Sequence, residues 1–183
     1  MLKRKLLTIA GVLAILACGA CLMPPLPQHH AALPPGLSSV HNIAVYVEDR
    51  TASHLFDPPA MSNATASNFN ELWSEFPVRA NPFSAGVPSD AVLKIAVLRK
   101  TASCTPHDNG KQFCSFEMIS SYTLTAADGT ILQSMPQKSA KFGVWYQGNS
   151  PPENLNANPF RHQASYWLAM TAGDLLMPNA LSN

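Results

Sequence analysis

The chain has 183 residues and a formal net charge of +1, and only 13% of its residues are charged. Charged residues usually make up about a quarter of a soluble protein. The low charge and the lack of a basic patch therefore argue against a nucleic-acid-binding protein. The length suffices for one domain with a sizeable core.

The start of the chain has the pattern of a secretory leader. Three basic residues, Lys3–Lys5, precede an apolar run from Leu6 to Ala17 that ends at Cys18. The run is too short to span a bilayer as a helix, which takes about 20 residues, and it suits a signal peptide. We expect residues 1–17 to be removed and Cys18 to become the lipidated first residue. Cleavage after Ala20 without lipidation is the alternative.

Acyl chains such as palmitate on Cys18 would hold the mature protein at a membrane. Each buried CH₂ contributes about 0.8 kcal/mol, so more than one chain gives a stable anchor. No Asp follows Cys18 directly. By analogy with enteric bacteria, this predicts the outer membrane, with the protein facing the periplasm. We further expect a flexible tether at 18–39, a single domain at 40–178 and a short tail at 179–183.

The first half of the domain is expected to hold two strands and a helix. Alternating apolar residues predict a strand around Ile43–Val47. Ser62 or Asn63 can cap a helix that ends before Pro77. Its apolar face is formed by Thr65, Phe69, Leu72, Trp73 and Phe76. A loop with several prolines then leads to a strand over 90–100.

The second half is expected to hold two more strands and a closing helix. Strands are predicted over 114–126, with the sheet resuming at Ile131–Leu132, and over 140–146. Asn158–Pro159 predicts the start of a helix that ends at Pro178. The order β-α-β-β-β-α predicts an α+β two-layer sandwich, with two helices on one face of a four-stranded, mostly antiparallel sheet.

Cys104 and Cys114 flank a polar turn between two predicted strands. In an oxidising periplasm they are well placed for a disulfide across a hairpin. A metal site using these cysteines and His107 is the alternative, but the spacing matches no common zinc pattern. Cys21 has no role that the sequence indicates.

The sequence offers little catalytic chemistry. It contains no glycine-rich phosphate loop and no HExxH, GxSxG or CxxC motif. Asp49, His54 and Asp57 lie near each other in sequence, but no nucleophile accompanies them. We therefore expect no enzyme activity, no metal and no cofactor. A secreted enzyme is the least favoured of the function classes.

Three segments resemble the lipopolysaccharide-assembly lipoproteins of the LptE family. They are the stretch from Leu33 through Ile43–Val45 to Arg50–Thr51, the start of a strand at Asp90–Leu93, and the hairpin from Tyr122 to Leu132. The resemblance covers residues 33 to 177. It implies insertion into an outer-membrane β-barrel partner and a role in placing lipopolysaccharide in the outer membrane.

Basic residues of that family are thought to meet lipid A phosphates. Arg99, Lys100 and Lys111, near the predicted hairpin tip, are the candidates here for contacts with an anionic lipid or a partner. The chain departs from the family after Cys18–Gly19, and a Cys104–Cys114 disulfide is not expected there.

A second resemblance fits nearly as well. Lipoproteins of the TolB-N-terminal, PelC and CsgG kind also begin with a strand like Asn42–Val45. That resemblance implies an accessory lipoprotein of a secretion or envelope complex, often an oligomeric ring.

Overall fold

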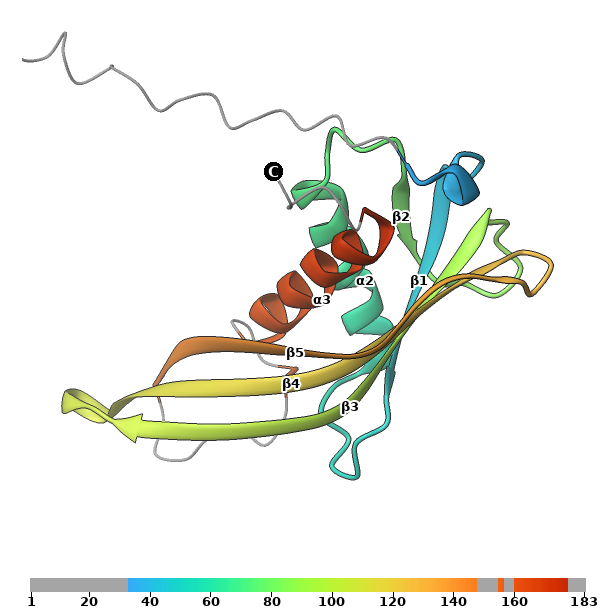
Figure 1. Cartoon of the computed structure of the whole chain (residues 1–183). Coiled ribbons are helices and arrows are strands. Elements are labelled where there is room, and N and C mark those ends of the chain that lie inside the picture. The colour runs from blue at the N-terminus through green and yellow to red at the C-terminus, as the bar shows by residue number, and fades with distance from the viewer. Residues whose placement is uncertain (1–32, 148–154, 157–159, 178–183) are drawn as a thin grey trace, which may run out of the picture.

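The computed structural model describes residues 33–147, 155–156 and 160–177, and it has two layers (Figure 1). Both helices lie on one face of a five-stranded sheet. The elements are η1 (Pro35–Leu37), β1 (Asn42–Asp49), α2 (Pro58–Leu72), β2 (Arg79–Pro82), β3 (Ala91–Pro106), η2 (Asp108–Gly110), β4 (Lys111–Ala126), β5 (Ile131–Gln147) and α3 (Phe160–Leu176). The predicted α+β sandwich is confirmed. The predicted start of α3 at Asn158–Pro159 lies outside the described residues.

The sheet has one strand more than predicted and is mixed. Its order is β2-β1-β3-β4-β5. β1 runs parallel to β2 and β3, whereas β3, β4 and β5 are antiparallel to one another. The missed strand, β2, has only four residues and ends in Pro82. A short segment with proline is typical of a loop, but proline is tolerated here because β2 lies at the edge of the sheet.

The strands β3, β4 and β5 are longer than predicted, with 16, 16 and 17 residues. The extension is largest in β5 and only three residues in β4. A register shift between Val97 and Arg99 marks a bulge in β3. Before it, odd-numbered residues face the helices. After it, even-numbered residues do, because a single extra residue inverts the alternation.

Helix α2 begins earlier than predicted, at Pro58, and Asp57 occupies the N-cap position. Proline is well suited to the first helical position because its missing N–H would have no partner there. Ser62 does not cap the helix. Its hydroxyl donates to the Pro58 carbonyl (2.8 Å) and accepts the backbone N–H of Val47 on β1 (2.9 Å). The side chain thus ties the helix to the sheet.

The two helices contact each other through a polar pair and a tryptophan. Asn68 on α2 donates to the Ser165 hydroxyl on α3 at 2.7 Å, in the protein interior. The indole N–H of Trp73 lies 3.3 Å from the Ala169 carbonyl. A Cβ on Gly173 would lie only 2.1 Å from the Trp73 ring, so the glycine is what lets the ring pack against α3.

We expect Gly173→Ala to lower the free energy of unfolding by about 1–3 kcal/mol, because overpacking of a close contact forces a shift of the ring or the helix. Urea denaturation measures the difference. Gly36→Ala is the matched control, since a Cβ there meets nothing within 4 Å. Equal stability of both variants would contradict this account of the contact between the helices.

The segment before β1 is more ordered than the predicted tether. Leu37 and Val40 are 1% and 3% exposed and belong to the core. The carboxylate of Asp90 accepts the backbone N–H groups of His41 and Asn42, each at 2.8 Å. The N–H of His41, followed by that of Asn42, holds the pKa of Asp90 below its ordinary value. A tether would therefore end before position 37, and residues 18–32 lie outside the described part.

Candidate functional site

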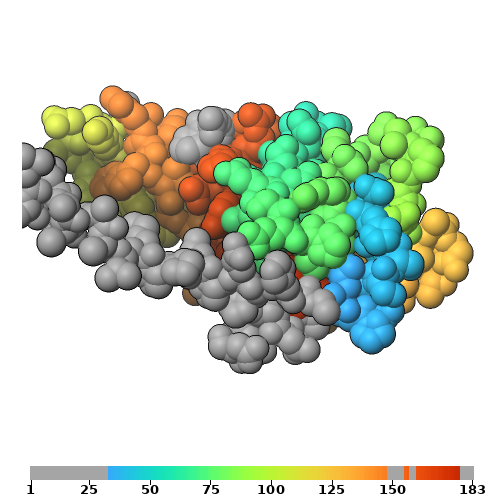
Figure 2. All heavy atoms as spheres, turned by 90° about the horizontal axis from the view of Figure 1, so that it is seen from above, coloured from blue at the N-terminus to red at the C-terminus, as the bar shows by residue number. Residues whose placement is uncertain are grey.

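The three long strands form an arm that extends to one side of the helices. The arm comprises residues 99–119 of the β3–β4 hairpin and 139–147 of β5 (Figure 1). In Figure 2 the end of this hairpin and the end of β5 lie together at one extremity of the molecule. The turn between β4 and β5 lies at the other extremity. The arm is thus the part of the fold that reaches furthest from the core.

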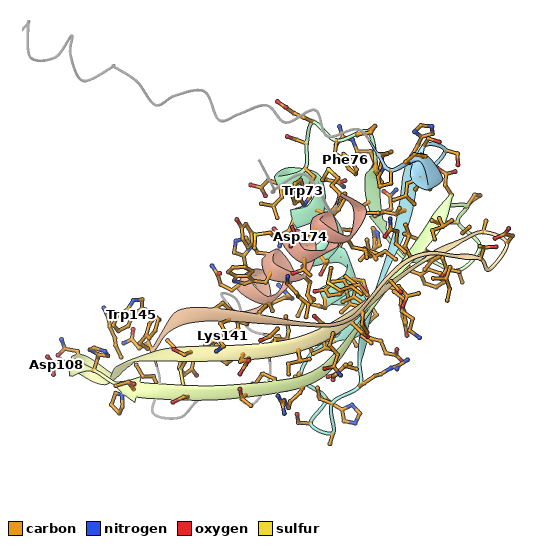
Figure 3. The ribbon with its side chains drawn as sticks, viewed as in Figure 1. Trp73, Phe76, Asp108, Lys141, Trp145 and Asp174 are labelled. Atoms are coloured by element: carbon orange, nitrogen blue, oxygen red, sulfur yellow. A yellow bond between two sulfur atoms is a disulfide. The ribbon has the colours of Figure 1, made fainter. Side chains whose placement is uncertain are left out.

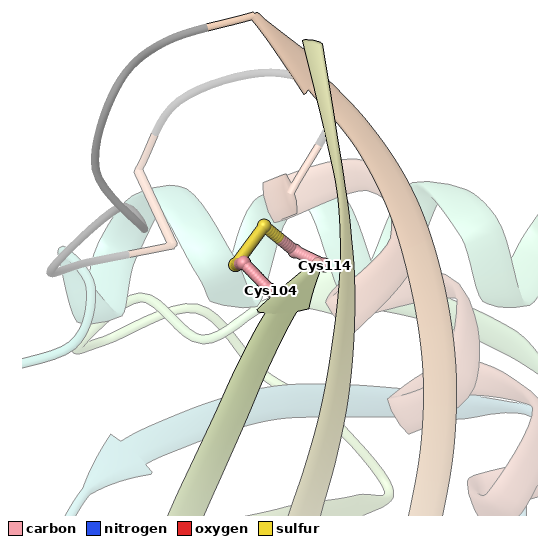
Figure 4. The surroundings of a disulfide bond; sticks show 2 residues. All are labelled: Cys104 and Cys114. Carbon is pink, nitrogen blue, oxygen red and sulfur yellow. A yellow bond between two sulfur atoms is a disulfide. The ribbon is translucent and has the colours of Figure 1, made fainter. Parts of the chain in front are cut away.

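One disulfide clamps the arm near its end. Cys104 on β3 and Cys114 on β4 are direct cross-strand partners and are joined by a bond of 2.06 Å (Figure 4). This confirms the predicted pairing, and it leaves no free thiolate for the alternative metal site. The hairpin loop is shorter than predicted, because both strands continue past the cysteines to Pro106 and from Lys111.

We call the side of the arm that faces away from the helices its outer face. Alternation along the three strands assigns to it Arg99, Thr101, Ser103, Lys111, Phe113, Ser115, Glu117, Lys141, Gly143 and Trp145. Most of these side chains are exposed, and most are polar or charged. The face therefore differs from the apolar side of the sheet, which packs against the helices.

The structure separates the three predicted contact residues. Arg99 and Lys111 are exposed on the outer face. Lys100 faces the other way, with its Nζ 5.2 Å from the centre of the Phe116 ring. Burial lowers the pKa of Lys100. The eight residues from Ile119, the partner of Arg99, to Lys111 span about 27 Å, so the two outer cations do not form one compact site.

Lys141 lies between Arg99 and Lys111 along the outer face. The sequence analysis did not identify it as a candidate. Lys141 pairs with Glu117 in the register of β4 and β5 and is labelled midway along the arm in Figure 3. The Glu117 carboxylate accepts a hydrogen bond of 2.7 Å from Ser139. With Arg99 and Lys111, this makes three cations and one anion on the face. The alternation of Phe142, Val144 and Tyr146 was the available signal, because it places Lys141 on the opposite side.

A shallow groove of about 480 Å³ crosses the outer face. Its polar lining includes Thr101, Ser103, Ser115, Glu117 and Lys141. At one end the ring of Phe113 lies over Gly143, where a Cβ would come within 2.2 Å of it. Such a surface offers hydroxyl, carboxylate and ammonium groups for hydrogen bonding, with one aromatic wall.

Three aromatic rings gather at the end of the arm, which we call the tip. Trp145 is 57% exposed, and its ring centre lies 4.8 Å from that of His107 and 5.3 Å from that of Phe113. Beside them is a cleft of about 440 Å³ lined by Lys111, Trp145, Tyr146 and Gln147. Figure 3 shows Trp145 and Asp108 near the end of the arm, far from Trp73 in the body.

Of the three residues considered for catalysis, Asp49 has a structural role through its carboxylate and Asp57 through its backbone. The Asp49 carboxylate accepts the backbone N–H groups of Thr51 (2.8 Å) and Leu55 and so shapes the loop after β1. The backbone N–H of Asp57 donates to the Asn156 side chain at 2.7 Å. Among the described residues, no group of three His, Cys, Asp or Glu side chains could hold a metal ion.

A hydrogen-bonded polar pair, Ser120 and Tyr122, lies in the core. Tyr122 is 2% exposed and accepts a hydrogen bond from Ser120 at 2.9 Å. Burial raises the pKa of Tyr122 to about 12, so the phenol stays neutral at physiological pH. On α3, burial also raises the pKa of Asp174.

No helix in the described part of the chain is long and apolar enough to cross a membrane.

No protein-family profile matches the chain, and no curated protein sequence does so. Among solved structures, it is similar to a protein from Caulobacter crescentus assigned as a lipoprotein, with 16% identity, 81% of this chain and 95% of that chain covered, and a TM-score of 0.39. It is also similar to a minor lipoprotein from Acinetobacter baumannii, with 9% identity, coverages of 76% and 92%, and a TM-score of 0.36.

The PelC dodecamer from Paraburkholderia phytofirmans is a third such structure. Its chain is 11% identical, the coverages are 75% of this chain and 89% of that chain, and the TM-score is 0.38. At these values the likeness says nothing about function.

Proposed function

We propose that this chain is a lipid-anchored envelope protein that acts by docking onto a larger partner and has no catalytic activity. The observation that carries the proposal is the disulfide-clamped arm with its exposed, polar outer face. A disulfide persists in an oxidising compartment, which agrees with export of the protein across the inner membrane. The leader before Cys18 supports the same location.

Within this class, an LptE-like role suits the arm best. The lumen of an outer-membrane β-barrel is polar, so a polar strand face can enter it without leaving apolar surface in contact with water. Arg99, Lys141 and Lys111 follow one another along the outer face and can meet the phosphates of a lipopolysaccharide. Charge-assisted hydrogen bonds to phosphate are among the strongest in proteins. In this proposal the protein helps a β-barrel partner to place lipopolysaccharide in the outer membrane.

The anchor is tested by mass spectrometry of the protein purified from envelope membranes. We expect the mature chain to begin at Cys18 and to carry thioether-linked lipid. A chain beginning at Cys21 without lipid, as cleavage after Ala20 would produce, would remove the basis for the location.

The lipid-binding role is tested with the triple variant Arg99→Gln, Lys111→Gln, Lys141→Gln. We expect it to retain clearly less lipopolysaccharide than the unmodified protein when both are purified in mild detergent. Lys138→Gln is the matched control, because Lys138 is an exposed cation on β5 that pairs with the helix-facing residue Ser120. Equal retention by the triple variant would contradict the role of the outer face. Co-purification of an outer-membrane β-barrel is the companion result that we expect.

An oligomeric accessory lipoprotein is the second candidate, and one observation favours it. In the described residues β5 is the last strand of the sheet, so the outer edge of a 17-residue strand has no partner strand. Such edges can pair with another chain. A ring of many copies in native mass spectrometry, without a β-barrel, would favour this candidate over the first.

A further inference from the structure

The tip presents apolar surface that the other described residues leave exposed. Trp145 is 57% exposed, whereas Trp73 packs against Gly173 and Trp167 is partly buried against the core. The three tip rings come from three segments: His107 from the hairpin loop, Phe113 from β4 and Trp145 from β5. These three rings therefore lie at the end of the arm, away from the aromatic residues of the core.

The local backbone holds these rings in place. The Cys104–Cys114 bond joins β3 and β4 shortly before the hairpin loop. The backbone N–H of His107 donates to the Lys111 carbonyl at 2.7 Å and closes the loop. The turn itself uses left-handed conformations at Asn109 (φ 62°) and Gly110 (φ 69°), which asparagine and glycine adopt readily. His107 and Phe113 are thus held on a closed, covalently clamped hairpin, and Trp145 of β5 packs beside both rings.

The size and chemistry of the tip suit a lipid surface. An aromatic side chain buries about 150–250 Å² when fully covered, so three rings that partly cover one another expose roughly a few hundred Å². That is well below the approximately 800 Å² per partner of a standard protein interface, and so disfavours a second copy as the occupant. Tryptophan beside a cation is typical of the headgroup layer of a bilayer. Here Lys111 lines the cleft next to Trp145, and Asp108 lies in the adjoining loop.

The length of the predicted tether allows this contact. From Cys18 to Leu33 there are 15 residues, which span at most about 50 Å when extended. Strand β4 from Tyr122, in the core, to Lys111, at the tip, advances eleven residues, or about 37 Å. Although η1 and the tip lie at opposite ends of the molecule, the domain can therefore lie along the membrane that holds its anchor (Figures 1 and 2).

We propose that the tip is a second membrane contact, in which Trp145, Phe113 and His107 enter the headgroup layer of a phospholipid bilayer and Lys111 meets the lipid phosphates. This deepens the proposed function, because it rests on the proposed location at a membrane. It does not depend on lipopolysaccharide or on a protein partner.

The test uses the full lipidated protein in vesicles of phosphatidylethanolamine and phosphatidylglycerol, with and without a lipid that carries a doxyl quencher high on its acyl chain. We expect the quencher to reduce the tryptophan fluorescence of the unmodified protein. Trp145→Phe should lose this reduction, because it removes the reporting indole and keeps an aromatic ring in the cluster. Trp167→Phe, on α3, is the matched control and should keep it.

Each other outcome overturns the proposal. If the unmodified protein is not quenched, the tip does not reach the bilayer. If Trp145→Phe is quenched as strongly as the unmodified protein, another tryptophan meets the lipid. If Trp145 is shielded from aqueous acrylamide only at high protein-to-lipid ratio and is not quenched by doxyl lipid, the occupant is a second copy. The double variant Arg99→Gln, Lys141→Gln keeps Lys111 at the tip. It should retain less lipopolysaccharide and be quenched as strongly as the unmodified protein, and a loss of its quenching would overturn the tip as a separate membrane contact.

Discussion

Replacing Phe116 with alanine is expected to lower the free energy of unfolding by about 3–5 kcal/mol, the usual cost of deleting a large buried aromatic side chain. Phe116 is 2% exposed and lies where the arm meets the helices. Its ring stacks on Phe142 of β5 (5.3 Å between ring centres) and meets Phe160 of α3 edge-on (5.3 Å). Lys100 covers part of the same ring. The truncation therefore removes contacts among three elements at once and leaves a cavity.

Urea denaturation followed by circular dichroism measures the change. Ser115→Ala is the matched control, because Ser115 is the exposed neighbour of Phe116 on the same strand, and its replacement should change stability by no more than about 0.5 kcal/mol. A Phe116→Ala variant as stable as the control would contradict the packing of α3 on the arm. It would also show that the arm does not depend on the helical layer.

Removing the disulfide with Cys104→Ala and Cys114→Ala is expected to cost about 2.5–3 kcal/mol of unfolding free energy. In the chain-entropy model, a closed loop of this length restricts the unfolded chain by that amount. The sequence separation of the two cysteines is 10. Cys114 is 0% exposed, so alanine also leaves a small gap in the core and adds to the loss.

Reductant separates the two contributions. Dithiothreitol should lower the urea midpoint of the unmodified protein and leave the midpoint of the double-alanine variant unchanged. If the reductant has no effect on the unmodified protein, the bond either does not form in the purified protein or does not stabilise it. The quenching experiment on Trp145 can be repeated with the reduced protein, where a less constrained hairpin should present the tip less well.

The main elements followed from local patterns in the sequence. Alternation of Ile43, Val45 and Val47 identified the first strand, and the period of Phe69 and Leu72 identified the first helix, because both patterns reflect one buried face. Cys104 and Cys114 were paired correctly, because two strands joined by a polar turn bring cross-strand neighbours together. These are short-range relations, which depend on residues close in sequence.

The site was predicted only in part. Arg99 and Lys111 were among the candidate contact residues, and both lie on the outer face of the arm. Lys100 was grouped with them, but it turns toward the helices and covers Phe116. Lys141 and the ring cluster at the tip were missed, because their neighbours in space come from other strands. The length of the arm was also missed, since the polar residues of 101–106 become a strand through pairing with β4.

By itself, the amino-acid sequence determined the class of fold, the position of the helices, the disulfide and the expectation of a lipidated leader. Each of these depends on local periodicity or on a short motif. The tertiary structure decided the fifth strand, the parallel pairing of β1 and the direction in which each arm residue faces. The bulge after Val97 shows the physical reason. Simple alternation would place Arg99 toward the helices and Lys100 toward solvent, and one extra residue in the ladder reverses both.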